Sequence, residues 1–192
     1  DAPVLPLGFP VGRDADDIAS RFELRRRVTV LIGSASSPVM TWGYRAPRVL
    51  LPASASAWPS DRKWIVLAHE LTHVARGDWA THLLAEAVCC LYWFNPLAWM
   101  ASRVLRQESE RACDDRLLTI GVSAPDYASH LVDLARAFRI NDHQRLPAPA
   151  IVRSSGLERR VRAMLNPRIN RRPVSVVGRQ RLVLAAAALV VS

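Results

Sequence analysis

The sequence predicts a mostly helical α+β fold in which a small β-sheet precedes a group of packed helices. Three observations predict it. Short runs rich in β-branched and aromatic residues fall within residues 28–51. Helical periodicity with start and stop signals then continues over residues 60–165. The pattern H-E-x-x-H at residues 69–73 places two histidines, which are candidate metal ligands, on the first long helix.

Three candidate strands make up the predicted sheet, at residues 28–32, 39–44 and 48–51. Pro47 and Pro52 border the last of these runs. Because proline has no backbone N–H to donate, this placement suits an edge strand or a strand end, and we do not expect a central strand there. We expect the sheet to pack on the helix that carries the histidines.

The first long helix is predicted to begin at Ser60 and to end before Gly77. Ser60 and Asp61 offer an N-cap and a negative first turn, which suit the free N–H groups and the dipole of a helix N-terminus. Gly77 stands where a left-handed C-cap is expected. Asp78 is then expected to cap a second helix.

The two histidines can act together because positions i and i+4 share one face of a helix. The imidazoles of His69 and His73 can therefore reach one zinc ion, and Glu70 can take a proton from a water molecule at the metal. The alternative is an amphipathic helix that carries two incidental histidines on its polar side. We favour the metal site, because a candidate third ligand follows in the sequence.

Several side chains compete for the place of the third ligand. A metzincin would need glycine and histidine three and six residues after His73, where Arg76 and Trp79 stand, so that class is excluded. His82 and Glu86 follow so closely that either would need a sharp reversal of the chain.

Glu110 is the best candidate for the third ligand, because its helix can pack antiparallel to the histidine helix. Asp114 lies one turn later on the same face, and its carboxylate can accept the ring N–H of a ligand histidine. The alternative for both residues is a solvated acidic helix face. We prefer that interpretation for Glu108 and Asp115.

The remaining helices surround this site in the prediction. Residues 79–101 are strongly apolar, and Asn95-Pro96 should break them into a helical hairpin that is either buried or dips into a membrane. Further helices are predicted over residues 102–120, 123–139 and 155–166.

Four linked motifs carry a resemblance to a known family: H-E-x-x-H with Arg76-Gly77-Asp78-Trp79 after it, Trp93-Phe94-Asn95-Pro96, Glu110-x-Ala112-Cys113-Asp114, and Pro38-x-x-Thr41-x-Gly43 followed by Leu50-Leu51-Pro52. Over residues 25–165 the chain resembles the membrane-integrated zinc peptidases of the BlaR/MecR type, which are β-lactam-sensing antirepressors and their relatives. The resemblance implies a gluzincin domain with the zinc ligands His69, His73 and Glu110, with Glu70 as catalytic carboxylate and Asp114 beside the ligands.

The resemblance also implies a substrate and a location. The substrate would be a transcriptional repressor, the protein itself, or both, and the catalytic domain would face the cytoplasm from the inner membrane of a bacterium. An extended peptide could add as a strand to an open sheet edge, for which we select the segment Val39, Met40, Thr41, Trp42 and Gly43. The sequence indicates no oligomeric state.

The net charge of +9 comes almost wholly from arginine, since Lys63 is the only lysine. Arginines crowd the C-terminal quarter before an apolar run, as at the cytoplasmic side of a membrane helix. We therefore expect the following division: a linker from a preceding membrane segment (1–20), the zinc peptidase domain (21–165), a basic juxtamembrane segment (166–181) and the start of a truncated transmembrane helix (182–192).

The basic segment has two interpretations. It can contact anionic lipid headgroups, which its charge favours, or it can be an exposed region for self-cleavage. Direct nucleic-acid binding is not expected, because no binding motif accompanies the charge. Three cysteines without a C-x-x-C pattern predict reduced thiols in a cytosolic compartment. Two other functions stay open: a housekeeping membrane metalloprotease of the CAAX-protease or heat-shock type, and a non-catalytic sensor-transducer domain.

Overall fold

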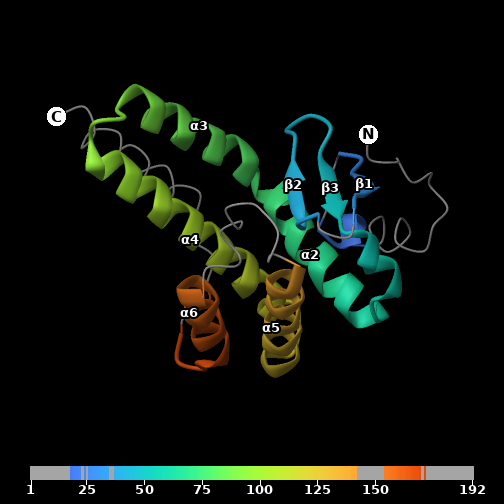
Figure 1. Cartoon of the computed structure of the whole chain (residues 1–192). Helices are drawn as coiled ribbons and strands as arrows, with labels where there is room; N and C mark the ends of the chain where they lie inside the picture. Colours follow the sequence, from blue (N-terminus) through green and yellow to red (C-terminus); the bar gives the residue numbers. More distant parts are fainter. Residues whose placement is uncertain are drawn as a thin grey trace.

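The computed structural model describes residues 18–22, 24, 26–34, 37–141, 154–169 and 171, with the side chains of residues 137–141 and 154–155 left aside. The described residues form a three-stranded sheet, a 3-10 helix (Ala53–Ala57) and the five α-helices α2 to α6, and residues 18–21 are helical as well (Figure 1). This is the mostly helical α+β architecture that the sequence predicts. Most of the expected N-terminal linker, most of the basic segment and the whole of the apolar run at 182–192 lie outside the described residues.

The sheet contains all three predicted strands: β1 (Thr29–Ile32), β2 (Met40–Trp42) and β3 (Arg48–Leu51). Strand β3 lies in the middle, parallel to β1 and antiparallel to β2. The expectation that no central strand lies there is therefore wrong, although the prolines do mark strand ends. Pro47 and Pro52 lie just outside its two ends, where a missing N–H removes no bond within the ladder, and the Pro47 carbonyl accepts a bond from Thr29.

Helix α2 (Ser60–Arg76) runs through the middle of the domain, and every residue from Ile65 to Thr72 is buried. It ends as predicted at Gly77, which has a φ of 70°. Its start differs from the prediction, because the extended backbone of Pro59 occupies the N-cap position and Ser60 is already the first helical residue. Inward side chains of β1 and β3 pack with α2 in the main hydrophobic core.

Helices α3 (Asp78–Leu91) and α4 (Pro96–Thr119) form a hairpin that breaks at Asn95-Pro96 as predicted, and they lie side by side (Figure 1). The separate helix expected over residues 102–120 is instead the continuation of α4. The side chain of Asn95 accepts a hydrogen bond of 2.9 Å from the backbone N–H of Leu97, which caps α4. Asp78 does not cap α3 as expected; it is the first residue of the helix, and Gly77 holds the cap position. None of the described helices combines the length and the apolar character that a membrane crossing requires.

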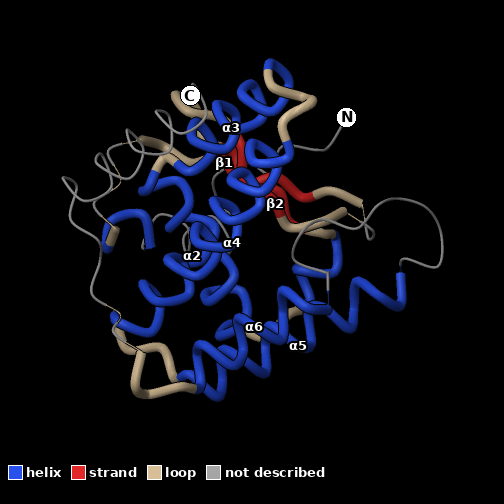
Figure 2. Tube along the Cα trace, turned by 90° about the vertical axis from the view of Figure 1, so that its left-hand side faces the viewer, coloured by secondary structure: helices blue, strands red, loops and turns tan. Residues whose placement is uncertain are grey.

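Helices α5 (Ala124–Asn141) and α6 (Ser154–Leu165) pack on each other, and α6 also packs on α4. Figures 1 and 2 place the strands and this helix pair on opposite sides of α2. The buried middle of α2 is therefore enclosed by elements from both ends of the chain.

Candidate metal centre

His69 and His73 on α2 meet Glu110 on α4 at the centre of the domain. The Nε2 atoms of the two histidines are 3.3 Å apart. Each of them lies 3.5 Å from one oxygen of the Glu110 carboxylate. The structure thus brings the three predicted ligands together, with all three ligand atoms within 4.8 Å of one another.

The spacing of these atoms fits a tetrahedral divalent metal. Ligands at zinc–nitrogen and zinc–oxygen distances of about 2.0–2.2 Å are separated by roughly 3.3–3.5 Å at a tetrahedral angle. The Nδ1 atoms of His69 and His73 are engaged by other side chains, which leaves both Nε2 atoms to face the shared space. Two imidazoles and one carboxylate are the donor set of many catalytic zinc sites.

Asp78 holds His73 in this orientation. Its Oδ2 atom lies 2.9 Å from His73 Nδ1 and also accepts hydrogen bonds from Ser109 (2.7 Å) and Arg76 (3.0 Å). Burial alone would raise the pKa of Asp78, but these contacts outweigh burial and lower that pKa to about 2. Burial alone would lower the pKa of His73, but the hydrogen bonds with Asp78 and Cys113 raise that pKa well above its ordinary value. The sequence analysis missed this role, because it assigned Asp78 to a helix cap.

A second group of possible ligands, His73, Asp78 and Cys113, lies on the far side of the His73 ring. Burial raises the pKa of Cys113 to about 11, so its thiol keeps the proton in the metal-free protein, where its sulfur lies 3.3 Å from His73 Nδ1. The Oδ2 atom of Asp78 already contacts His73, Arg76 and Ser109. We therefore interpret this group as support for the His73 ring.

Tyr127 connects His69 to Asp114. Its hydroxyl lies 2.8 Å from His69 Nδ1 and donates a 2.6 Å hydrogen bond to Asp114 Oδ1. Burial and the neighbouring Asp114 raise the pKa of Tyr127 well above its ordinary value, so the hydroxyl keeps the proton that it donates. Asp114 itself is 3.5 Å from His69 Nδ1. The predicted contact between aspartate and histidine thus runs through a tyrosine that sequence reasoning gave no role.

Arg160, on α6, contacts two of the acidic residues of α4, Glu110 and Asp114. It donates two hydrogen bonds to Asp114, of 2.8 and 2.7 Å, and its Nη1 atom lies 2.8 Å from Glu110 Oε2. Burial opposes ionisation of Glu110, yet the nearby His69 and Arg160 hold its pKa well below its ordinary value. In the sequence Arg160 is one of many arginines in a basic stretch, and no pattern distinguishes it.

Glu70 lies at the same site, buried against the sheet. The hydroxyl of Thr41, on β2, donates a 2.5 Å hydrogen bond to Glu70 Oε2. This contact joins the candidate catalytic carboxylate to the segment that we selected for substrate binding. In that segment only Met40–Trp42 is a strand; Val39 is buried in the core and Gly43 begins a turn with a φ of 91°.

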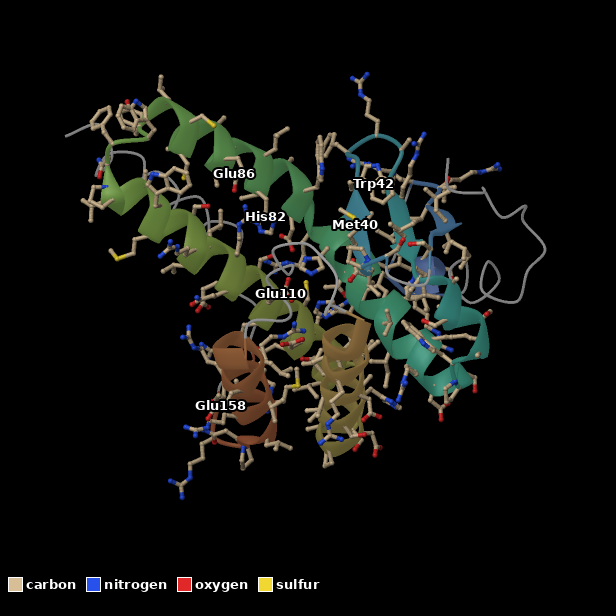
Figure 3. All side chains as sticks on the ribbon, in the orientation of Figure 1. Met40, Trp42, His82, Glu86, Glu110 and Glu158 are labelled. Carbon is tan, nitrogen blue, oxygen red and sulfur yellow. The ribbon has the colours of Figure 1, made fainter. Side chains whose placement is uncertain are left out.

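A cleft of about 410 Å³ opens in front of these residues, and Val39, Met40, Thr41, Gly43, Glu70, His73 and Glu110 are among those that line it. Trp42 is not among the lining residues. His82 lines the cleft on the α3 side and, as Figure 3 shows, lies between α3 and α4 toward Glu110. Glu86 pairs with Arg106 and is not a lining residue. Neither His82 nor Glu86 joins the group of three ligand atoms.

Comparisons with known proteins identify relatives of this chain. The family model described as BlaR1 peptidase M56 matches residues 16–164. The regulatory protein BlaR1 of Bacillus licheniformis is 37% identical over 82 residues, which are 43% of this chain and 14% of that protein. The methicillin resistance mecR1 proteins of Staphylococcus aureus and Staphylococcus epidermidis are 26% identical over 98 residues, which are 50% of this chain and 17% of theirs. The chain thus matches less than a fifth of the length of these relatives. Because the family model covers most of the sequence, the chain belongs to the BlaR1 peptidase M56 family.

Proposed function

We propose that this chain carries the zinc endopeptidase domain, of the gluzincin type, of a bacterial membrane signalling protein. The observation that carries the proposal is the convergence of His69, His73 and Glu110 on one point, beside Glu70 in an open cleft. Family membership in a peptidase family supports the same reaction class. His69, His73 and Glu110 would hold the ion.

Each residue near the candidate metal site has a separate role in the proposed hydrolysis of a peptide bond. A zinc ion held here would act as a Lewis acid toward the peptide carbonyl and would make water more acidic. Glu70 accepts the proton of the attacking water and passes it to the leaving amine. Thr41 orients the Glu70 carboxylate. Asp78 orients His73, and Tyr127 orients His69.

A donor for the developing negative charge on the carbonyl oxygen would complete the site. Two candidate donors follow the H-E-x-x-H motif, Arg76 and His82, and Arg76 is engaged by Asp78. His82 lines the cleft, and its Nε2 atom has no hydrogen-bond partner among the described residues. We therefore assign this role to His82 in the proposed mechanism.

Strand β2 is the element that would bind the substrate backbone. It lies at one edge of the sheet, with β3 on one side, and Met40 and Thr41 line the cleft. A peptide that adds as a further strand to β2 would pass directly over Glu70. The regulatory names of the relatives support a repressor or the protein itself as the substrate.

The tip of the α3–α4 hairpin supports attachment to a membrane surface. Residues 87–102 contain no charged side chain. Trp93 and Phe94 are 71% and 68% exposed, and Leu91 beside them is 70% exposed. Aromatic side chains of this kind concentrate at membrane interfaces. We propose that this tip enters the interface of the cytoplasmic leaflet, where the basic C-terminal segment can contact anionic headgroups.

One substitution separates an endopeptidase from a non-catalytic transducer. Glu70→Gln keeps the size and shape of the side chain but removes the proton acceptor. We expect the variant to retain about one zinc ion per chain by elemental analysis and to cleave none of the bonds that the wild-type chain cleaves in a proteome-derived peptide library. Equal cleavage by the variant, or a wild-type chain without metal and without cleavage, would refute the proposal.

A further inference from the structure

We propose that Arg160 is a positioning residue of the metal site: through its direct contacts it holds the Glu110 and Asp114 carboxylates in place, and it thereby sets how tightly the site binds its metal. The inference rests on the proposed function in one respect, which is that His69, His73 and Glu110 bind a divalent ion. It adds a residue from a distant helix to that site.

The contacts of the guanidinium group carry the first step. Its Nε and Nη2 atoms form a bidentate pair with the two oxygens of Asp114, at 2.8 and 2.7 Å. Its remaining nitrogen, Nη1, lies 2.8 Å from Glu110 Oε2. All three nitrogens therefore face carboxylates, and the side chain is only 10% exposed. A planar guanidinium group that binds carboxylates in this way fixes their orientation and also compensates their negative charge.

The charges around Arg160 explain why the contact matters for the metal. Glu110 and Asp114 lie one turn apart on the same face of α4, and both are partly or fully buried. Two carboxylates at this distance repel each other, and each is costly to bury without a partner. The positive charge of Arg160 reduces this repulsion and gives each carboxylate an ion-pair partner. Without it, the Glu110 side chain would be free to turn away from the histidines toward solvent.

The position of α6 allows this direct contact to be separated from helix docking in general. Arg171, which follows α6, also anchors this region to α4: its Nε atom lies 3.3 Å from Asp115 Oδ1, and its Nη2 atom donates to the carbonyl of Met164 at the end of α6. Arg171 touches neither Glu110 nor Asp114 in these contacts. A substitution there loosens the same helix without removing the group next to the ligand.

Cobalt(II) serves as the probe, because its visible absorption reports the coordination of the metal independently of catalysis. We would titrate it into the metal-free forms of the wild-type chain and of Arg160→Met, Arg160→Lys, Arg171→Met and Arg162→Met. Arg162 is an exposed residue of the same helix that pairs only with Glu158 among the described residues. Circular dichroism and thermal unfolding of each metal-free form would establish that it is folded.

We expect Arg160→Met to weaken cobalt binding about 10- to 100-fold and to alter the absorption bands, as loss of a group that orients a ligand does. Arg160→Lys should recover part of the affinity, because lysine keeps the charge but not the planar guanidinium group. Arg171→Met and Arg162→Met should bind as the wild type does.

Wild-type affinity and spectrum in folded Arg160→Met would overturn the inference. If that variant does not fold, the same result in folded Arg160→Lys would overturn it. An equal loss of affinity in Arg171→Met would also overturn it, because helix docking and not the direct contact would then be responsible. A wild-type chain that gives no tetrahedral cobalt spectrum would instead refute the metal site itself, and with it the proposed function.

Discussion

His73 and Asp78 face each other across the glycine that joins helices α2 and α3, with His73 Nδ1 2.9 Å from Asp78 Oδ2. The left-handed turn at Gly77 makes this contact possible, because it sends the first residue of α3 back toward the last turn of α2. The backbone conformation of Gly77 therefore helps to set the orientation of the His73 ring.

Replacing Asp78 by asparagine should therefore weaken metal binding. The neutral amide of asparagine accepts the hydrogen bond of the His73 ring more weakly than a carboxylate does. Groups that orient a ligand histidine typically contribute 10- to 100-fold to metal affinity. We expect a loss of about that size in zinc titrations of Asp78→Asn. The matched control is Asp133→Asn, which removes a carboxylate that pairs with Arg62, and neither of these two residues lines the cleft. Unchanged affinity in Asp78→Asn would contradict the role of the contact.

The same pair should give the metal-free protein a pH-dependent stability. The pKa of Asp78 is lowered to about 2, so its contribution is present above pH 4 and is lost as the pH falls from about 4 to 2. The pKa of His73 is raised, so its contribution is lost as the pH rises through that raised value. Urea unfolding of the wild type and Asp78→Asn should differ by about 2 kcal/mol above pH 4, by progressively less as the pH falls from about 4 to 2, and by somewhat less again once His73 has lost its proton at high pH. A difference that does not vary with pH would contradict the prediction.

Thr41 should affect the catalytic step and not metal binding. Its hydroxyl donates to Glu70 Oε2, so Thr41→Val leaves the carboxylate free to rotate. We expect kcat to fall about 10-fold with little change in zinc content, because correct positioning of a proton acceptor contributes on this scale. Thr41→Ser keeps the hydroxyl and should retain most of the activity. Equal loss in the valine and serine variants would indicate that packing of the methyl group is what matters.

His82 should be needed for turnover if it donates to the carbonyl oxygen. Loss of one such donor typically lowers kcat about 100-fold, and His82→Phe keeps the ring while removing both nitrogens. The control is Glu86→Gln, one turn further along α3, where the side chain pairs with Arg106. Zinc content should be unchanged in both variants. Full activity in a folded His82→Phe would remove this residue from the mechanism.

The hairpin tip should bind lipid vesicles. Trp93 and Phe94 are among its most exposed side chains, so replacing both by serine removes apolar area that would otherwise enter the interface. We expect the double variant to sediment with vesicles of phosphatidylethanolamine and phosphatidylglycerol far less than the wild type does. Ile120→Ser, at the opposite end of α4, removes an apolar side chain that is 41% exposed and should have no effect.

Local patterns in the sequence predicted the elements that depend on neighbours along the chain. The helix of the H-E-x-x-H motif, its end at Gly77 and the break at Asn95-Pro96 all follow from residues within a few positions of each other. The proximity of Glu110 to His69 and His73 could be expected as well, because helical spacing and the motif that follows limited the choice of a third ligand.

Contacts between distant segments could not be predicted in this way. Tyr127 is separated from His69 by 58 residues, and Arg160 from Asp114 by 46. Their roles depend on how α5 and α6 pack, which a single sequence does not encode as a pattern. The central place of β3 was missed for the same reason, since strand order is decided by pairing across the sheet and the prolines constrain only the ends.

The chain order of the site has a consequence for the newly made protein. Both histidines and Glu110 leave the ribosome before α6, so the nascent domain holds its three ligands while the arginine that contacts Glu110 and Asp114 is still absent. Domains fold as units during synthesis, from the N-terminal side. Translation therefore delivers the three candidate ligands before Arg160, so the contacts of Arg160 with Glu110 and Asp114 form only after α6 has been made.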